Sequence, residues 1–379
     1  MAALQPVATA VPDDRWIEAT YRVRTTASDV DARAQAIALE QSIELPLAAV
    51  TDARVLRDVV ARVAGIAQVA PDAFDVTIRL ATETVGGEAG QLLNMLFGNT
   101  SMHDDVSLVD AAFPPDFAAG FGGPRAGIAG LRALTGVVAR PLTATALKPQ
   151  GLSTAQFAEL AATFARAGID VVKDDHGLAD QASSPFAERV PAVQRAIDAA
   201  NRDTGRHCVY VPNLTGHYAL MRERAALARE AGVRMLMLAP MVSGIASLAD
   251  LAGHAGLPIM AHPAMAGGAR IAPPLLLGKL FRLCGADATI FPNDGGRFGY
   301  SAAMCSAITD AARARWAGVA PAMPVPAGGM TLERVPEMRA RYGDDAMLLI
   351  GGGLLLAREQ LAARCREFVA AVGASTEAQ

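Results

Sequence analysis

From about position 143 onward, short apolar runs alternate with amphipathic segments. The runs have the length of β-strands and are apolar throughout, which is typical of strands buried on both faces of a sheet. Between them, as in 154–168 and 219–232, apolar residues recur every three or four positions, which is the spacing of an amphipathic helix. The pattern predicts eight strands, at 143–149, 170–176, 208–216, 234–240, 257–263, 288–294, 323–329 and 346–353.

This repeated strand–helix unit fits two architectures. A doubly wound open sheet has the same alternation of strands and helices, but eight units without a long extra element favour a closed barrel. The chain has 379 residues, which leaves room for a second domain beside a barrel of about 250 residues. We therefore predict an α/β protein whose residues 136–379 form a (β/α)8 TIM barrel.

The first 135 residues show a different pattern. Strand-like and helix-like segments are mixed there, which predicts a smaller α+β domain of the ferredoxin-like kind over 1–135. The stretch 117–127 is rich in Gly and Pro and is predicted to be a connection. The expected elements are strands at 20–25 and 75–81 and helices at 31–43 and 88–98.

Composition and charge exclude several classes of protein. The chain is 52% apolar and 19% charged, which predicts a packed globular protein. A net charge of −4 provides no basic field for nucleic acid. The four cysteines form no CxxC pair, so we expect reduced thiols and a cytoplasmic location. We find no signal-peptide pattern and no apolar run of the ~18–20 residues that a membrane span needs.

Glycine clusters follow the last two predicted strands. Gly328 and Gly329 end the seventh strand, and Gly351 and Gly352 end the eighth. Backbone N–H groups in such loops approach anions closely, and in barrels the loops after these two strands often bind phosphate. Tight turns without a ligand are the alternative. Two clusters on adjacent late strands favour a phosphate site.

The end of the second predicted strand is its most polar part. Lys173, Asp174, Asp175 and His176 directly follow an apolar run. Carboxylates beside an imidazole suit a hard divalent ion, which would stabilise an enolate or polarise a carbonyl. The alternative is a solvated surface face, which is what most runs of charge are.

Two further polar residues end predicted strands. Lys148 closes the first strand, and a lysine in a dry pocket or among cations loses pKa and can act as a base. The alternative is that Lys148 binds phosphate or forms a structural ion pair. His262 closes the fifth strand before Pro263 and is either catalytic or a buried, hydrogen-bonded core histidine.

Together these segments resemble the large-subunit family of ribulose-bisphosphate carboxylase (RuBisCO), in its RuBisCO-like branch, from about Glu40 to Gly353. GIDVVKDDH is similar to the family's G-x-D-x-x-K-x-D-E segment, which binds Mg2+ through a carbamylated lysine and two carboxylates. The resemblance implies Mg2+ as cofactor, Lys173 as the carbamate candidate, and Asp175 and His176 as further ligands, with His176 in place of the glutamate.

Other segments extend the resemblance. TALKPQGLS is similar to the strand-1 motif whose lysine shuttles a proton in enolisation, which implies that role for Lys148. PIMAHPAMAG retains the family's histidine as His262, and PVPAGGM and LLIGGG are similar to the two phosphate loops. LEQSIELP and LLNMLFGN resemble segments that serve a partner subunit's site. They imply substrate-binding roles for Glu40 and Asn94 and a homodimer with shared active sites.

Departures from the family argue against CO2 fixation. The loop PNDGGRFGYS lacks the lysine that contacts the new carboxylate, and Gln150 replaces the second strand-1 lysine. Pro263 stands where the family has a phosphate-binding arginine, so we expect a monophosphate substrate. Asn293 and Arg297 remain as candidate substrate or phosphate contacts.

The step that carboxylases and RuBisCO-like proteins share is the formation of a metal-stabilised enolate. The resemblance therefore predicts an enolate formed from a phosphorylated keto sugar or oxo-acid sugar. The preferred prediction is decarboxylation or C–C cleavage of a 3-oxo-acid-sugar phosphate of the 3-oxo-isoapionate 4-phosphate type. The alternative is an isomerase or enolase acting on a methylthio-sugar phosphate of the 5-methylthioribulose 1-phosphate type in methionine salvage. A non-catalytic sugar-phosphate-binding barrel and a Schiff-base aldolase with Lys148 or Lys173 are the rival classes.

Overall fold

The computed structural model describes residues 14–374, which fall into two compact units. One consists of the described residues up to Phe121 together with Gly268–Leu275, and the other of Gly122–Gly267 and the described residues from Leu276 on. The predicted domain division at 135/136 remains a proposal beside these contact-defined units. No helix of the described part is long and apolar enough to cross a membrane.

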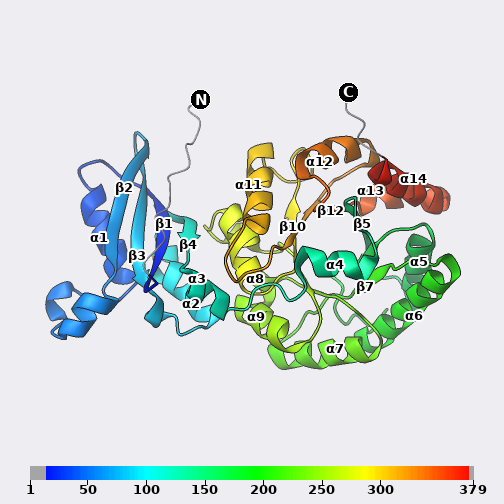
Figure 1. Ribbon diagram of the computed structural model, residues 1–379, viewed down its shortest axis with the longest axis horizontal. Coiled ribbons are helices and arrows are strands. Elements are labelled where there is room, and N and C mark those ends of the chain that lie inside the picture. Colours follow the sequence, from blue (N-terminus) through cyan, green and yellow to red (C-terminus); the bar gives the residue numbers. More distant parts are fainter. Residues whose placement is uncertain (1–13, 375–379) are drawn as a thin grey trace. The chain divides into compact units, whose positions relative to one another are not determined.

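The N-terminal unit is built on a four-stranded antiparallel sheet of order β2-β3-β1-β4 (Figure 1). Tyr21 of β1 donates a hydrogen bond of 2.7 Å to the Leu96 carbonyl of α2, which fastens the helix to the sheet. The elements are β1 Trp16–Arg24, α1 Val30–Glu40, β2 Arg62–Ala70, β3 Ala73–Ala81, α2 Ala89–Phe97, β4 Val106–Ala112 and α3 Pro115–Gly120.

Two features of this unit differ from the sequence-based expectation. The strands β2 and β4 were not predicted, and β2 is exposed along almost its whole length, so it lacks the alternation that reveals a half-buried strand. The stretch 117–127 was predicted to be a connection, but it contains the end of α3 and the first residue of the next helix. Pro115 begins α3, where its missing N–H costs nothing.

The second unit contains the eight predicted parallel strands, arranged as a barrel. They form two four-stranded sheets, of order β12-β5-β6-β7 and β11-β10-β9-β8. A bridge between Asn213 and Met237 joins β7 to β8, and β11 lies against β12. Each strand is shorter than its predicted run: β5 Leu142–Leu147, β6 Val171–Asp174, β7 Val209–Val211, β8 Leu236–Leu238, β9 Ile259–Ala261, β10 Ala288–Pro292, β11 Met323–Ala327 and β12 Met347–Leu349.

Helices surround these strands in Figure 1. The two amphipathic segments predicted from apolar spacing are confirmed as α5 and α7, and α5 begins with a capping box between Ser153 and Gln156. The helices are α4 Gly127–Thr135, α5 Thr154–Arg166, α6 Phe186–Thr204, α7 Tyr218–Glu230, α8 Pro240–Ser243, α9 Ile245–His254, α10 Phe281–Leu283, α11 Ala302–Arg313, α12 Val335–Tyr342, α13 Gly352–Leu355 and α14 Leu361–Gly373.

The barrel interior is filled by small and medium apolar side chains from all eight strands. Val171 of β6 and Val209 and Val211 of β7 belong to this cluster. Because successive side chains of a strand point to opposite faces, Lys173 and Asp175 continue the inward row of Val171, and Asn213 continues that of β7. The barrel core therefore ends in polar side chains at the carboxyl ends of these strands.

Candidate active site

The centre of the candidate site is an ion pair between Lys148, just after β5, and Asp175, just after β6. The Lys148 side chain is 37% exposed and that of Asp175 only 7%. Parallel pairing of β5 with β6, which aligns Ala146 with Lys173, brings the two groups to the same level of the barrel. Lys148 and the segment Lys173–His176 are therefore neighbours at the carboxyl ends of β5 and β6.

Asp175 is held in its ionised form. Burial by itself raises the pKa of this carboxyl, but hydrogen bonds from His176 and Lys148 and from the Gly177 N–H, at 3.0 Å, outweigh it. The pKa of Asp175 consequently lies well below its usual range. The ionised carboxylate of Asp175 pairs with the Lys148 side chain and holds it in place.

Lys173 is buried beneath this pair. Only 3% of the residue is exposed, and its Nζ donates a hydrogen bond of 2.9 Å to the Asp174 carbonyl. Burial lowers its pKa to about 8, against the attraction of Asp175 and with the help of the Lys148 charge. A large share of Lys173 is therefore uncharged in mildly alkaline solution, where the neutral amine has a free lone pair.

Two histidines complete the cluster. The rings of His176 and His262 stack with centroids 4.3 Å apart and planes 7° from parallel. His176 Nδ1 lies 3.5 Å from Asp175 Oδ1. His262 Nδ1 accepts a 3.1 Å hydrogen bond from the Ala264 N–H, so a neutral His262 ring carries its proton on Nε2. Burial, with the charges of Lys173 and His176, holds the pKa of His262 far below its ordinary value.

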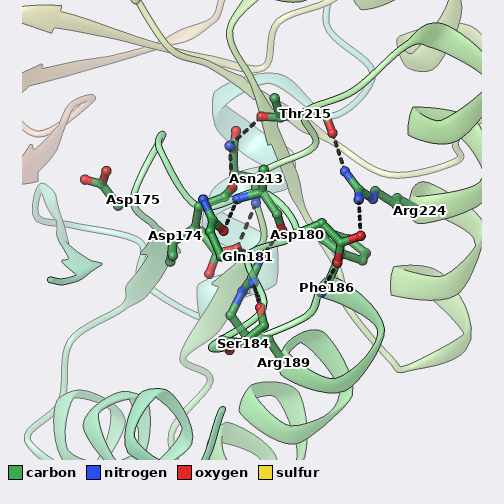
Figure 2. A network of polar contacts seen from close by, with 12 residues as sticks. Asp174, Asp175, Asp180, Gln181, Ser184, Phe186, Arg189, Asn213, Thr215 and Arg224 are labelled. Carbon is green, nitrogen blue, oxygen red and sulfur yellow. Dashed lines mark hydrogen bonds and ion pairs between the residues drawn. The ribbon is translucent and has the colours of Figure 1, made fainter. Parts of the chain in front are cut away.

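Asp174 is separated from the cluster although it adjoins it in sequence. Figure 2 shows the carboxylates of Asp174 and Asp175 pointing in different directions. Asp174 Oδ2 is 3.3 Å from the Arg189 guanidinium of α6, and neither side chain is exposed. The Tyr210 hydroxyl donates to Asp174 Oδ1 at 2.8 Å. Asp174 is therefore an anchor between β6, β7 and α6.

The two predicted phosphate-binding glycine pairs differ: Gly328–Gly329 forms a turn, whereas Gly351 precedes α13 and Gly352 begins it. Gly328 and Gly329 both have left-handed backbones, with φ of +88° and +85°. A Cβ on Gly329 would lie 2.9 Å from Arg297 Cγ, and the Arg297 N–H donates to the Gly328 carbonyl at 3.0 Å. Gly351 lies beside the Lys148 side chain, since a Cβ there would be 3.9 Å from Lys148 Cε. Gly352 has open space around its Cα.

The two candidates on the loop after β10 differ. Arg297 is exposed, with its guanidinium 5.5 Å from the centre of the Phe298 ring. Asn293 is fully buried, and its amide accepts from the Tyr342 hydroxyl and donates to the Asp294 carbonyl. This arrangement favours a supporting role for Asn293, so the predicted substrate contact stays a prediction.

Glu40 and Asn94 lie in the N-terminal unit, at the end of α1 and within α2. Glu40 accepts a 2.9 Å hydrogen bond from Asn99, and Asn94 donates a 3.3 Å bond to Gln91. Gln41 connects the two segments through a hydrogen bond of 3.3 Å to the Asn94 carbonyl. The unit thus holds both residues in one region, and their role in a partner's site stays a prediction.

The donor set fits Mg2+ on one condition. Within residues 14–374, no group of three or more His, Cys, Asp or Glu side chains could hold a metal ion. Asp175 is a single carboxylate, whereas Mg2+ prefers several oxygen ligands. A carbamate on Lys173 would add oxygens next to Asp175, and the lowered pKa of Lys173 supplies the neutral amine that reacts with CO2. The residues therefore fit a divalent ion when Lys173 is carbamylated.

One contact in this region was not foreseen. The side-chain amide of Gln150 lies so close to Gly177 that a Cβ on that glycine would collide with it. In the sequence, Gln150 stands out only as a departure from the family's lysine. Its contact with the turn after β6 arises because the loop after β5 folds over the neighbouring strand end, which no local sequence pattern reveals.

Comparison with known proteins agrees with this geometry. The model of the ribulose bisphosphate carboxylase large chain, catalytic domain, matches residues 127–376. A relative named 5-methylthioribulose-1-phosphate isomerase, from Rhodospirillum rubrum, is 51% identical over 358 residues, which cover 94% of this chain and 96% of that one. A 2,3-diketo-5-methylthiopentyl-1-phosphate enolase from Geobacillus thermodenitrificans is 33% identical over 290 residues, covering 74% and 70%. The crystal structure of a Rubisco-like protein from Rhodopseudomonas palustris superposes with a TM-score of 0.90 at 46% identity, covering 97% of this chain and all of that one.

An α/β barrel that follows an α+β unit, with polar residues at the strand ends, defines the class of protein. The chain belongs to the RuBisCO large-chain family, in its RuBisCO-like branch. The predicted fold class and the resemblance are thereby confirmed, and the relatives support an enzyme that is not a carboxylase. Their names favour the methylthio-sugar alternative over the preferred prediction of a 3-oxo-acid-sugar phosphate, which no relative named above supports.

Proposed function

We propose that this enzyme isomerises 5-methylthioribulose 1-phosphate, or a close analogue, through an enediolate in methionine salvage. The observation that carries the proposal is the cluster of Lys148, Asp175, Lys173 and His262 at the carboxyl ends of β5, β6 and β9, with Gly351 beside Lys148. The relative that is 51% identical over nearly the whole chain supports this choice of substrate. The earlier preference for decarboxylation or C–C cleavage has no such support.

The reaction needs a base beside a carbonyl, and Lys148 fits that task. Its side chain is partly exposed at the mouth of the barrel, beside Gly351 at the end of β12. In the proposed mechanism the neutral amine of Lys148 removes a proton from a carbon next to the substrate carbonyl, and the resulting ammonium returns a proton to another carbon. Asp175 accepts a hydrogen bond from the amine in the first step and pairs with the ammonium in the second. No atom is gained or lost, as an isomerisation requires.

His262 complements Lys148 as a hydrogen-bond donor. The Ala264 N–H occupies Nδ1, which leaves the Nε2 proton of the neutral ring for the substrate. A neutral imidazole is suited to polarise a carbonyl and to stabilise the enediolate oxygen without giving up its proton. The stacked ring of His176 restricts His262 to this orientation.

Carbamylated Lys173, Asp175 and His176 would hold the Mg2+ ion. When bound, the ion polarises the carbonyl and stabilises the negative charge of the enediolate. Lys173 is buried, so the modified side chain would be shielded from bulk water. His176 replaces a carboxylate, so the site carries less negative charge than the family's usual ligand set.

The phosphate binds, in this proposal, at the turns Gly328–Gly329 and Gly351–Gly352, with Arg297 as a charged contact. One phosphate is sufficient, because Pro263 has replaced the family's second phosphate anchor. Asn293 supports the loop after β10. Glu40 and Asn94 contact substrate in the partner's site of a homodimer, as the resemblance implies.

Turnover of synthetic 5-methylthioribulose 1-phosphate tests the proposal. The protein is incubated in D2O with Mg2+ and bicarbonate, and the products are followed by 1H and 31P NMR. We expect an isomeric phosphate that carries deuterium at a carbon next to a carbonyl, and no release of CO2 or inorganic phosphate. Absence of both exchange and product would contradict an enolising enzyme and favour the non-catalytic barrel.

A second candidate is enolisation of 2,3-diketo-5-methylthiopentyl 1-phosphate. The 33% identical enolase favours it, although at lower identity and coverage than the isomerase. The same residues would remove a proton next to a carbonyl and protonate an oxygen instead of a second carbon. Ultraviolet absorption of the conjugated enol distinguishes this product from the isomer.

A further inference from the structure

The turn that carries Asp175 and His176 is not held by the barrel's sheet. The β6 strand ends at Asp174, and its ladder with β5 and β7 does not extend beyond that residue. Inside the turn, the Leu178 N–H donates to the Asp175 carbonyl at 3.0 Å, which fixes only its local shape. Another group must fix the turn against the rest of the barrel.

Asn213, two residues beyond the end of β7, supplies that contact. Its Nδ2 lies 2.9 Å from the His176 carbonyl and 2.8 Å from the Leu178 carbonyl, so one amide binds the turn on both sides of Gly177 (Figure 2). Nδ2 also lies 2.8 Å from Thr215 Oγ1. Asn213 is 1% exposed, so water does not compete for these bonds.

Asn213 is itself rigidly placed. Its backbone N–H donates to Asp174 Oδ2 at 3.2 Å, and its neighbour Leu214 donates to the Met237 carbonyl of β8 at 2.7 Å. Asp174 is fixed in turn by Arg189, which also donates to the Ala179 carbonyl at 2.9 Å. A continuous set of hydrogen bonds therefore leads from α6 and β8 to the turn.

The other end of the amide indicates that stability alone does not explain this residue. Asn213 Oδ1 is buried and has no hydrogen-bond partner within residues 14–374. A buried polar atom without a partner costs free energy, so such an atom calls for an explanation. The donors of the amide are used in full, and they contact only the turn that carries the candidate site and the adjacent Thr215.

We propose that Asn213 is a positioning residue, whose amide sets the turn after β6 so that Asp175 meets Lys148 and His176 stacks on His262. The inference rests on the proposed function of that site. Asn213 touches no reacting atom in this scheme. Its loss frees the carbonyls of His176 and Leu178 and lets Asp175 shift relative to Lys148.

The test compares two asparagines whose side chains bond to the backbone at the two ends of β7: Asn213, just beyond the strand, and Asn201 of α6. Asn213→Leu retains the branching at Cγ and removes the donors. Asn201→Leu is the matched control, because Asn201 makes the same kind of side-chain bonds to Cys208 at the start of the strand, at 2.9 and 2.8 Å. We expect Asn213→Leu to lower kcat by about 100-fold and to change KM by less than about threefold, since the phosphate turns are elsewhere. Asn201→Leu lowers stability and leaves kcat within about threefold.

A second measurement does not depend on activity. Stacked rings shift each other's proton resonances, so the ring protons of His176 and His262 report the position of the turn in NMR spectra of histidine-labelled protein. Asn213→Leu should move these resonances toward those of free histidine, and Asn201→Leu should leave them in place. If Asn213→Leu does not fold, Asn213→Ser replaces it, because a serine is too short to reach both carbonyls.

Unchanged histidine shifts, or an unchanged kcat, in the Asn213 variant would overturn the proposal. If the wild-type protein turns over neither methylthio-sugar phosphate, the proposed function fails instead. The histidine shifts then decide by themselves whether Asn213 holds the turn.

Discussion

The two faces of β6 carry the same residue type in opposite surroundings. On the inner face, Asp175 is ion-paired to Lys148 at the barrel mouth, above the buried amine of Lys173. On the outer face, Asp174 is enclosed by Arg189 and Tyr210 and is not exposed at all. Burial raises the pKa of Asp174, whereas the donors around Asp175 hold its pKa well below the usual range.

This difference shows that one short polar segment can supply both site residues and a structural anchor. Successive side chains of a strand point to opposite faces, so a run of four polar residues serves two purposes. The inner residues line the candidate site, and the outer one fastens the strand to α6. The comparison predicts that mutations on the inner face abolish activity and that mutations on the outer face abolish stability.

Lys173→Met should have the largest effect. We expect turnover to fall by at least about 1000-fold, because neither a carbamate nor a neutral amine can form. The free energy of unfolding at pH 7 should rise by about 2–3 kcal/mol, because the substitution removes the cost of burying a lysine charge, which the lowered pKa reflects. Urea unfolding and a kinetic assay check both.

The sign of this stability effect depends on pH. The pKa of Lys173 is about 8 in the folded protein and 10.5 as an ordinary lysine. Burial of the Lys173 charge lowers the free energy of unfolding of the wild-type protein by its full amount below about pH 8. This cost disappears as the pH rises toward 10.5. Lys148→Met is the control, because its partly exposed side chain should give no such gain. A stability loss in Lys173→Met at pH 7 would contradict the inferred burial cost.

Asp175→Asn and Asp174→Asn test the two faces directly. Asp175→Asn should lower turnover by about 100-fold and cost less stability than Asp174→Asn, since its partner Lys148 is partly exposed and is solvated when the pair is lost. Asp174→Asn should lower the free energy of unfolding by about 3–5 kcal/mol, because it leaves the buried Arg189 charge without a counter-ion. Chemical unfolding measured beside kcat separates the two. The opposite assignment of effects would refute the division between the faces.

The pH dependence of activation should follow Lys173. Protonated amine does not react with CO2, so at fixed dissolved CO2 the activity should rise about tenfold per pH unit below 8 and level off above it. If Lys173 had an ordinary lysine pKa, the activity would still be rising at pH 9.5. The measurement is initial rate against pH after equilibration with Mg2+ and CO2. A profile that is flat from pH 6 to 9 would remove Lys173 from activation.

Arg297→Met should have the smallest effect. Arg297 is exposed and lies far from β6 in the sequence. Its predicted contact is with the phosphate alone. We expect KM to rise by about tenfold with little change in kcat, as for the loss of one charged hydrogen bond. Glu337→Gln, which alters only the contacts of Glu337 with Arg334 and Arg341, is the control. A large loss of kcat would place Arg297 nearer the reacting atoms than proposed.

Much of the fold was predictable because its signals are local. The eight barrel strands are apolar on both faces, and the helices between them keep a three-to-four-residue period, so both patterns survive in the sequence. Strand β2 was missed because its exposed side chains do not alternate. Strand ends were predicted too long, since each apolar run continues past the last ladder pair into the loop.

The candidate site was predictable only in part. Lys148, Lys173, Asp175 and His262 were chosen from strand ends and from family motifs, and the structure brings them into one cluster. Asn293 was chosen in the same way, yet its amide bonds to Tyr342 of α12, on the helix side of β10 and not in the barrel interior. A polar residue at a strand end points inward or outward according to register, which sequence spacing indicates only approximately.

By itself the sequence determined the barrel, the family and the residue types available for chemistry, because apolar period and short motifs depend on neighbours along the chain. Only the tertiary structure decided which of Asp174 and Asp175 faces the substrate, that His176 stacks on His262, and that Asn213 fixes the turn between them. These contacts join residues from β6, β7 and β9, and their geometry is set by the pairing and pleat of parallel strands rather than by any local pattern.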